Sequence, residues 1–283
     1  MSRLRISAIS YLNTVPLMWD FEHGPSQERL RQQFEVTYTI PSACAESLRD
    51  GTADIGIIPV AAYATIPGLV VLPGVAIAAQ NAVRSILLVS HKPLEEVKTV
   101  ALDTSSMTSV ALCKVLLTKW LGGQREYQSM APDIEAMLGS CDAALVIGDP
   151  ALLLQCSSYA TVIDLAEAWR KHTGKPFVFA FWAVREQAIA GPGAGPGAAT
   201  EAVRGLAQVF QQSRDHGIEP ASLQRITTDW APRLGLGADE LRNYLTRNIY
   251  YSLDPPCQEG LQLFYAYAAE VEALPPVQAP IFA

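Results

Sequence analysis

Short apolar runs alternate with helix-like segments along the first two thirds of the chain. Each run has the length and composition of a buried strand, and the runs cover residues 4–9, 34–40, 54–59, 70–78, 85–90, 99–102, 143–147, 162–163 and 176–184. Because segments with helical spacing separate many of these runs, the pattern predicts βαβ units and mostly parallel sheets.

The strands fall into two groups, which predicts two α/β lobes. The pattern restarts after His91-Lys92-Pro93, and the apolar run at residues 176–184 returns the chain through the core. We expect the chain to pass from one lobe to the other and back, crossing near residues 90–95 and 175–185. This division assigns residues 1–92 and 181–283 to lobe 1 and residues 93–180 to lobe 2.

The last third of the chain has the spacing of helices. We expect them over residues 202–213, 222–233, 237–248 and 258–273. The run GPGAGPG at residues 191–197 can hold neither a helix nor a strand and predicts a surface loop. In the last helix Leu261, Phe264, Tyr265 and Ala268 share one face, which is typical of core packing.

The strongest candidate for a ligand site lies where the strand at residues 99–102 leads into a helix. Six small polar residues occupy seven positions there: Asp103, Thr104, Ser105, Ser106, Thr108 and Ser109, with Met107 between them. A helix N-terminus beside several hydroxyls favours an anion such as a carboxylate. Serine and threonine are also the ordinary N-cap residues, so a plain cap is the alternative. No glycine-rich nucleotide loop is present.

Polar residues also follow other strands. Tyr11 and Asn13 follow the first strand, Ser42 follows the second, and Ser85 and the pair Gly148-Asp149 adjoin later strands. In open α/β sheets ligands bind at the carboxyl ends of strands, so one shared cleft would collect these groups. Their neutral donors suit an organic carboxylate. Asn13 is equally compatible with a ligand contact and with an ordinary turn residue. Asp149, which precedes Pro150, could act either as a general base or as a turn former.

Composition narrows the function classes. The 283 residues include 21 cationic and 28 acidic side chains, a net charge of −7, and no basic run that would suit nucleic acid. No apolar stretch approaches the ~20 residues of a membrane span, and the N-terminus lacks the pattern of a secretory signal. We therefore expect a cytoplasmic protein without nucleic-acid or membrane partners.

The cysteines and histidines have no spacing typical of a metal site. The five cysteines include no C-x-x-C pair, which predicts free thiols in a reducing compartment. The four histidines are scattered along the chain and lack the spacing of metal ligands. No Ser-His-Asp order, Cys-His pair or G-x-G-x-x-G motif indicates a familiar catalytic class. The residues alone predict a two-lobed α/β protein that binds a small organic anion.

Seven segments together resemble the chorismate dehydratase family of the futalosine route to menaquinone. They are SAISYLNTVPL, SLRDGTADIGIIPV, VRSILLVS, LDTSSMTS, ALVIGDPAL, PFVFAFWAVR and NIYYSLDPPCQEGLQLFYAYA. The resemblance implies the fold of type 2 periplasmic binding proteins, used in the cytoplasm as an enzyme. The implied reaction removes water from chorismate, a dicarboxylate, to give 3-[(1-carboxyvinyl)oxy]benzoate. Since the ring becomes aromatic, no metal or redox cofactor is expected.

Two alternatives to this function stay open. A sister family, 1,4-dihydroxy-6-naphthoate synthase, has the same fold, although Tyr11-Leu12-Asn13 favours the dehydratase. A cytosolic anion-binding module without catalysis would share the lobes and the cleft. The sequence makes no prediction of oligomeric state.

The resemblance leads to a hypothesis for the site residues. Asn13 and Ser85 are the expected catalytic pair, which orients the leaving hydroxyl and the enolpyruvyl group. The expected substrate-binding residues are Tyr11, Ser42, Thr104, Ser105, Ser106, Met107, Thr108, Gly148 and Asp149. Within this set, Ser105, Ser106 and Thr108 hold one carboxylate together with helix N–H groups. Because no protein base is evident, the substrate's own side-chain carboxylate takes the proton.

Overall fold

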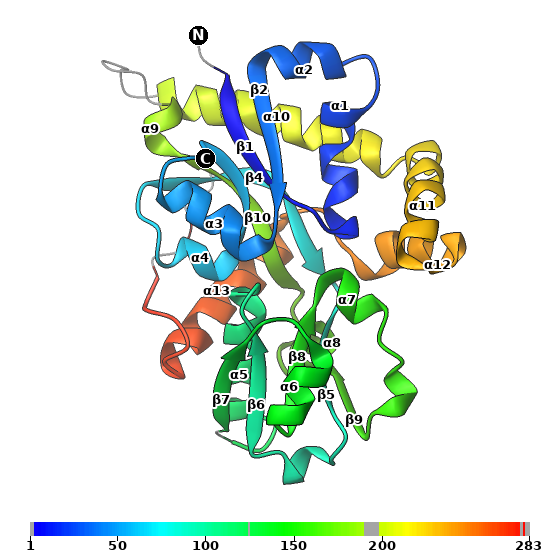
Figure 1. The fold of residues 1–283 in the computed structure, drawn as a ribbon. Coiled ribbons are helices and arrows are strands. Elements are labelled where there is room, and N and C mark those ends of the chain that lie inside the picture. The colour runs from blue at the N-terminus through cyan, green and yellow to red at the C-terminus, as the bar shows by residue number, and fades with distance from the viewer. Residues whose placement is uncertain (1–2, 124, 190–197, 278–279, 281–283) are drawn as a thin grey trace.

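Two five-stranded sheets form the framework of the protein, one in each lobe (Figure 1). The computed structural model describes residues 3–123, 125–189, 198–277 and 280. The first sheet has the order β2 (Phe34–Thr39), β1 (Leu4–Ile9), β3 (Ile55–Pro59), β10 (Phe177–Arg185) and β4 (Leu69–Ala79). The second has the order β7 (Glu126–Met130), β6 (Thr99–Asp103), β8 (Ala143–Ile147), β5 (Ile86–Ser90) and β9 (Thr161–Asp164).

The prediction of mostly parallel sheets is confirmed, because in each sheet four strands point the same way and one strand runs against them. In the first sheet β1 runs parallel to β2 and β3, whereas β10 runs antiparallel to β3 and β4. In the second sheet β6 runs parallel to β7 and β8, whereas β5 runs antiparallel to β8 and β9. The two antiparallel strands are those that arrive from the other lobe. They do not follow a helical crossover within their own sheet, the connection that makes neighbours parallel.

The strand expected over residues 85–90 forms, but in the second sheet and not as an extension of the first. It is β5, which lies between β8 and β9. The chain therefore leaves the first lobe between β4 and β5 and returns ahead of β10. The division at residues 92 and 180 stays a prediction, and the strand pairing leads us to propose boundaries just ahead of β5 and β10.

Helices cover both sheets (Figure 1). Those of the first lobe are η1 (Leu12–Met18), α1 (Trp19–Glu22), α2 (Gln27–Gln33), α3 (Pro41–Arg49), α4 (Val60–Tyr63), α9 (Glu186–Ile189), α10 (Ala198–Gly217), α11 (Pro220–Leu234), α12 (Ala238–Asn243) and η4 (Tyr244–Asn248). Those of the second are η2 (Leu94–Glu96), α5 (Thr108–Lys119), α6 (Ile134–Ser140), α7 (Gly148–Leu152), η3 (Cys156–Ser158) and α8 (Leu165–Thr173). The last helix is α13 (Pro255–Glu270).

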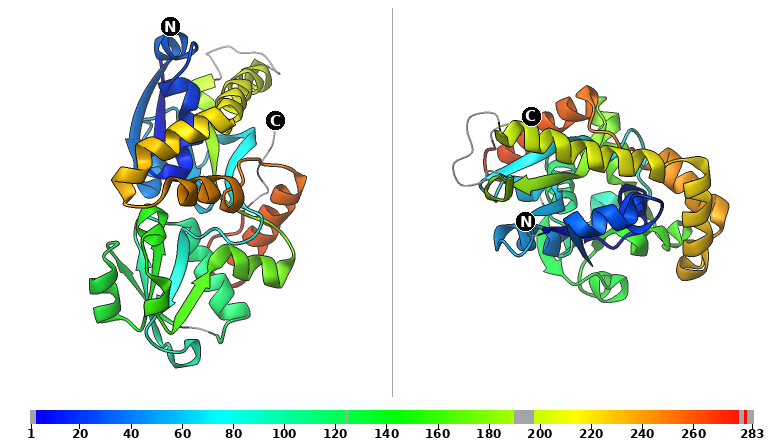
Figure 2. Two further views of the ribbon diagram at one scale, coloured as in Figure 1. Left: turned by 90° about the vertical axis from the view of Figure 1, so that its right-hand side faces the viewer. Right: turned by 90° about the horizontal axis from the view of Figure 1, so that it is seen from above.

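The helical last third of the chain is confirmed with one change. The helix expected over residues 237–248 is divided, because α12 gives way at Tyr244 to one turn of π-helix, η4. The side view in Figure 2 shows α10 on the first lobe and α12 near the junction with the green second lobe. The loop expected at residues 191–197 lies outside the described residues. None of the helices in the described ranges has the length and apolar character needed to cross a bilayer.

The larger apolar core includes residues of both lobes, and α13 packs against α5 of the second lobe and β10 of the first. The rings of Trp120, directly after α5, and Tyr267 on α13 meet edge to face at 5.5 Å, and Trp169 on α8 meets Phe264 in the same way at 6.3 Å. Such pairs add to the free energy gained by burial of the rings. The five cysteines are free thiols, four of them buried and Cys156 exposed.

Candidate active site

A narrow cavity of about 50 Å³ lies between the lobes. Its lining residues are Ile9, Tyr11, Asn13, Pro41, Pro59, Ile77, Ser85, Ile86, Ser106, Thr108, Ser109, Ile147, Gly148, Phe179 and Ala180. They come from the ends of strands in both sheets and from the first turns of η1, α3 and α5. Within the described part of the chain this lining contains hydroxyls, one amide and apolar groups, but no carboxylate, imidazole, amine or guanidinium.

The N-terminus of α5 opens at the cavity. Its N-cap residue, Met107, makes no side-chain hydrogen bond to the helix. The Ser106 hydroxyl accepts the Ser109 N–H at 3.2 Å and keeps its own hydrogen for another partner. Among the described residues the N–H groups of Met107 and Thr108 have no acceptor. A helix N-terminus with free amides and a nearby hydroxyl is a suitable site for an anion.

Thr108 connects the lobes instead of offering a free hydroxyl. Its Oγ1 donates to the carbonyl oxygen of Phe179 on β10 at 3.0 Å and accepts the Ala61 N–H on α4 at 3.2 Å. The hydrogen and one lone pair of this hydroxyl are thus in use. A ligand at this point would meet the Thr108 amide and methyl group.

The N–H and hydroxyl donors of Ser105 are also hydrogen-bonded within the protein. The Asp103 Oδ1 accepts both the Ser105 N–H, at 2.8 Å, and the Ser105 hydroxyl, at 2.6 Å. Burial raises the pKa of the Asp103 carboxyl, and its second oxygen has no partner within the described residues. Ser105 therefore shapes the turn, and its hydroxyl is also in contact with that of Tyr11.

Asn13 and Ser85 lie at the cavity beside a residue that the sequence analysis did not single out. The Tyr244 hydroxyl donates to the Ser85 Oγ at 2.9 Å, and the Asn13 side chain lies close to it. Tyr244 is 159 residues from Ser85 along the chain, and its neighbours have the spacing of an ordinary core helix. No local signal in the sequence marks it.

Gly148 allows the Tyr11 ring to pack close to the start of α7. Its φ is +67°, and a Cβ there would lie 2.6 Å from the Tyr11 Cε2 atom. The Gly148 N–H donates to the carbonyl oxygen of Ser85 at 2.8 Å. Only glycine combines this left-handed conformation with this close contact.

Asp149 lies outside the cavity lining and bonds across the lobes. Its carboxylate accepts the Leu12 N–H at the start of η1, at 3.1 Å. Burial raises the pKa of Asp149 to about 6, against the opposing effect of that hydrogen bond. Of its two suggested roles, this geometry matches a structural acceptor better than a base facing the substrate.

The remaining candidates also lie outside the lining. Ser42 donates its backbone N–H to the Ser105 carbonyl oxygen at 3.2 Å, Thr104 is exposed, and Met107 is half-buried. The structure thus brings Tyr11, Asn13, Ser85, Ser106, Thr108 and Gly148 together at one cavity. It leaves Ser42, Thr104, Ser105, Met107 and Asp149 at its margin or beyond it. Substrate roles for all of these residues stay predictions.

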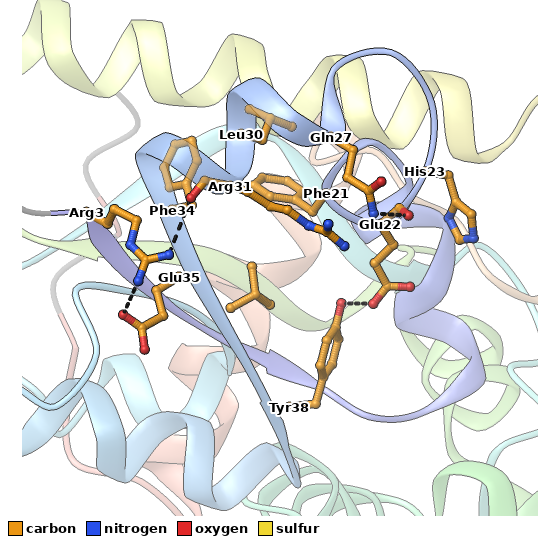
Figure 3. A pocket seen from close by; sticks show the side chains of 11 residues that line it. Arg3, Phe21, Glu22, His23, Gln27, Leu30, Arg31, Phe34, Glu35 and Tyr38 are labelled. Carbon is orange, nitrogen blue, oxygen red and sulfur yellow. Dashed lines mark hydrogen bonds and ion pairs between the residues drawn. The ribbon is translucent and has the colours of Figure 1, made fainter.

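A larger hollow of about 690 Å³ lies on the outer side of the first lobe, near β2 and α2 (Figure 3). Both of its carboxylates have partners: Glu35 meets Arg3 at 3.4 Å, and Glu22 accepts the Tyr38 hydroxyl. The hollow involves one lobe only. The cavity between the lobes is therefore the better candidate.

Comparisons with known proteins show the family and the fold of the chain. A family model described as menaquinone biosynthesis matches residues 4–270. The chain belongs to this family. It is also 30% identical over 268 residues to the chorismate dehydratase of Thermus thermophilus, a match that covers 88% of this chain and 90% of the relative.

Solved structures of distant relatives establish the fold of this member of the menaquinone biosynthesis family. The alkanesulfonate-binding protein SsuA of Xanthomonas axonopodis pv. citri, bound to MOPS, matches with a TM-score of 0.66 and 15% identity, over 97% of this chain and 95% of that chain. The Candida albicans CA3427 gene product, which has the generic periplasmic binding protein fold, matches with a TM-score of 0.59 and 10% identity, over 100% and 98%. The expected two-lobed periplasmic-binding-protein-like fold is confirmed.

Substitution Gly148→Ala is expected to destabilise the protein by on the order of 2–3 kcal/mol, because the left-handed backbone and the clash with Tyr11 add together. Gly174→Ala is the matched control. Gly174 has a φ of +70° with nothing within 4 Å of its added Cβ, so it should lose only about 1 kcal/mol. Urea unfolding of both variants measures the difference, and equal losses would contradict the close packing against Tyr11.

Substitution Asp149→Asn is expected to change the pH dependence of stability. The raised pKa means that the native state holds this proton more tightly than the unfolded chain, so the contribution of Asp149 falls as pH rises through about 4 to 6. Asparagine keeps an oxygen for the Leu12 N–H without the buried charge. Relative to wild type the variant should therefore gain unfolding free energy from about pH 4 to about pH 7, by at most about 3 kcal/mol.

Urea unfolding across this pH range tests the expectation. Asp239→Asn, which removes an exposed carboxylate on α12, is the control. A difference between Asp149→Asn and wild type that stays constant with pH would show that the Asp149 carboxyl is not perturbed by burial.

Proposed function

We propose that this protein is a chorismate dehydratase, a hydro-lyase that acts in menaquinone biosynthesis. The main support is the relative of that name, 30% identical over 88% of the chain, together with membership of the menaquinone biosynthesis family. In the proposed reaction the C3–H and C4–O bonds of chorismate break, a C3=C4 bond forms and one water leaves. The product is 3-[(1-carboxyvinyl)oxy]benzoate, whose aromatic ring drives the elimination.

The cavity suits an anionic ring acid because its donors are neutral and directed inward. The Ser106 hydroxyl and the free amides of Met107 and Thr108 would hold one carboxylate at the N-terminus of α5. Apolar groups such as Ile77 and Phe179 would face the ring. Asn13 and Ser85, which line the same cavity, would contact the reacting carbons.

The proton acceptor in this proposal is the substrate itself. No carboxylate or imidazole lines the cavity within the described residues, so the enolpyruvyl carboxylate would take the C3 proton. The protein then contributes orientation and preorganised donors for the departing hydroxyl. Since about 50 Å³ holds only a few water molecules, the lobes must open to admit substrate and close again over it. We place this reaction in the cytoplasm, where free thiols persist.

Incubation of the purified protein with chorismate, followed by mass spectrometry, tests the function. The expected product has lost one water and has an aromatic absorbance that grows with time. A thermal shift with unchanged chorismate would instead indicate an anion-binding protein, as in the MOPS-bound structural relative. Turnover only of the cyclic substrate of 1,4-dihydroxy-6-naphthoate synthase would assign the protein to that reaction.

Substitution Ser106→Ala is expected to raise KM for chorismate about tenfold and to change kcat less, because a hydroxyl that holds a carboxylate in both ground and transition states contributes mainly to binding. Ser140→Ala removes an exposed hydroxyl at the end of α6 and serves as the control. Steady-state kinetics provide the measurement. Wild-type KM in Ser106→Ala would exclude this hydroxyl from the carboxylate site.

A further inference from the structure

Tyr244 joins the two residues expected at the reacting carbons. It is only 1% exposed, and its hydroxyl lies 2.9 Å from the Ser85 Oγ and within hydrogen-bond reach of the Asn13 side chain. It comes from η4, one turn of π-helix, a local irregularity that occurs frequently at functional sites. No charged group is among these three side chains.

The hydrogen bonds of the three side chains have a consistent direction. The Asn13 Oδ1 accepts the Thr14 hydroxyl at 3.3 Å, so the Asn13 amide group is available to donate to the Tyr244 oxygen. Tyr244 has a single hydrogen, which it gives to Ser85. Ser85 then accepts from Tyr244, and its own hydrogen is left for a partner in the cavity that Ser85 lines.

The backbone that carries Ser85 is also held firmly. Arg84 has a φ of +63°, which is unfavourable for a residue other than glycine. Its N–H donates to the Asp164 Oδ2 at 2.6 Å, and the Asn248 side chain on η4 donates to the Ala82 carbonyl oxygen at 2.9 Å. The same turn of π-helix thus fixes both the Ser85 segment and the direction of the Ser85 hydroxyl.

We infer that Tyr244 is a positioning residue, which turns the Ser85 hydroxyl so that it presents a hydrogen, not a lone pair, to the departing C4 oxygen of the substrate. This inference rests on the proposed dehydratase function. As the C4–O bond breaks, negative charge grows on that oxygen, and a donor already aimed at it stabilises the transition state more than the ground state. A Ser85 free to rotate would lose part of that stabilisation.

Tyr244→Phe keeps the ring and removes the oxygen, so we expect a folded protein whose kcat falls tenfold to a hundredfold while KM changes less than threefold. Two other buried tyrosines are matched controls. Tyr251→Phe removes a hydroxyl that has no partner within the described residues, and Tyr265→Phe removes one that donates to the Val60 carbonyl oxygen at 2.8 Å. Both controls should keep wild-type kcat, even if Tyr265→Phe lowers Tm.

A double-mutant cycle separates positioning from general structural support. If Tyr244 acts through Ser85, the variants Ser85→Ala and Ser85→Ala/Tyr244→Phe should have the same kcat within twofold. A further tenfold loss in the double variant, or wild-type kcat in Tyr244→Phe, would overturn the inference. A wild-type protein that leaves chorismate unchanged would refute the proposed function itself, and that result is distinct from either outcome of the cycle.

Discussion

The backbone donors at the starts of helices govern how the two lobes meet. The first N–H groups of a helix have no partner inside it and require an acceptor or water. In the first lobe, Leu12 at η1 and Ala61 at α4 find their acceptors in the second lobe, on Asp149 and Thr108. A third donor, in the first turn of α3, reaches the Ser105 carbonyl oxygen. The cavity is the space left between these contacts.

This arrangement explains how an acidic protein can hold an anion without a cation in its cavity. The net charge of −7 opposes binding at long range, but salt and water screen exposed charges over about 10 Å. Inside the cavity, oriented dipoles act at short range in a medium of low dielectric constant. Asp103 and Asp149 lie close by, and burial raises the pKa of each carboxyl.

The local hydrophobic pattern predicted the strands well where both faces are buried, as in β8 and β10. A short, continuous apolar run is typical of a strand that is buried on both faces. The pattern missed β7, an edge strand with mostly polar residues. It placed β5 in the wrong sheet, since strand pairing is decided by contacts distant in the sequence. The same limit applies to the site. The cluster of hydroxyls near residue 105 could be recognised from the sequence. The hydrogen bond from Ser105 to Asp103 and the contact of Tyr244 with Ser85 could not, because they depend on the folded geometry.

The relative strength of the contacts determines which side of the junction opens. On the cavity side the lobes meet through a few hydrogen bonds, each contributing about 0.5–1.5 kcal/mol. Elsewhere α13 places Phe264 and Tyr267 against Trp169 and Trp120, and burial of each large ring contributes about 1.5–3 kcal/mol. Separation of the lobes at the polar contacts would therefore cost less free energy than separation of the aromatic ones. Because Ser85 and Tyr244 both lie near the crossing of the chain, their hydrogen bond can persist while the cavity opens.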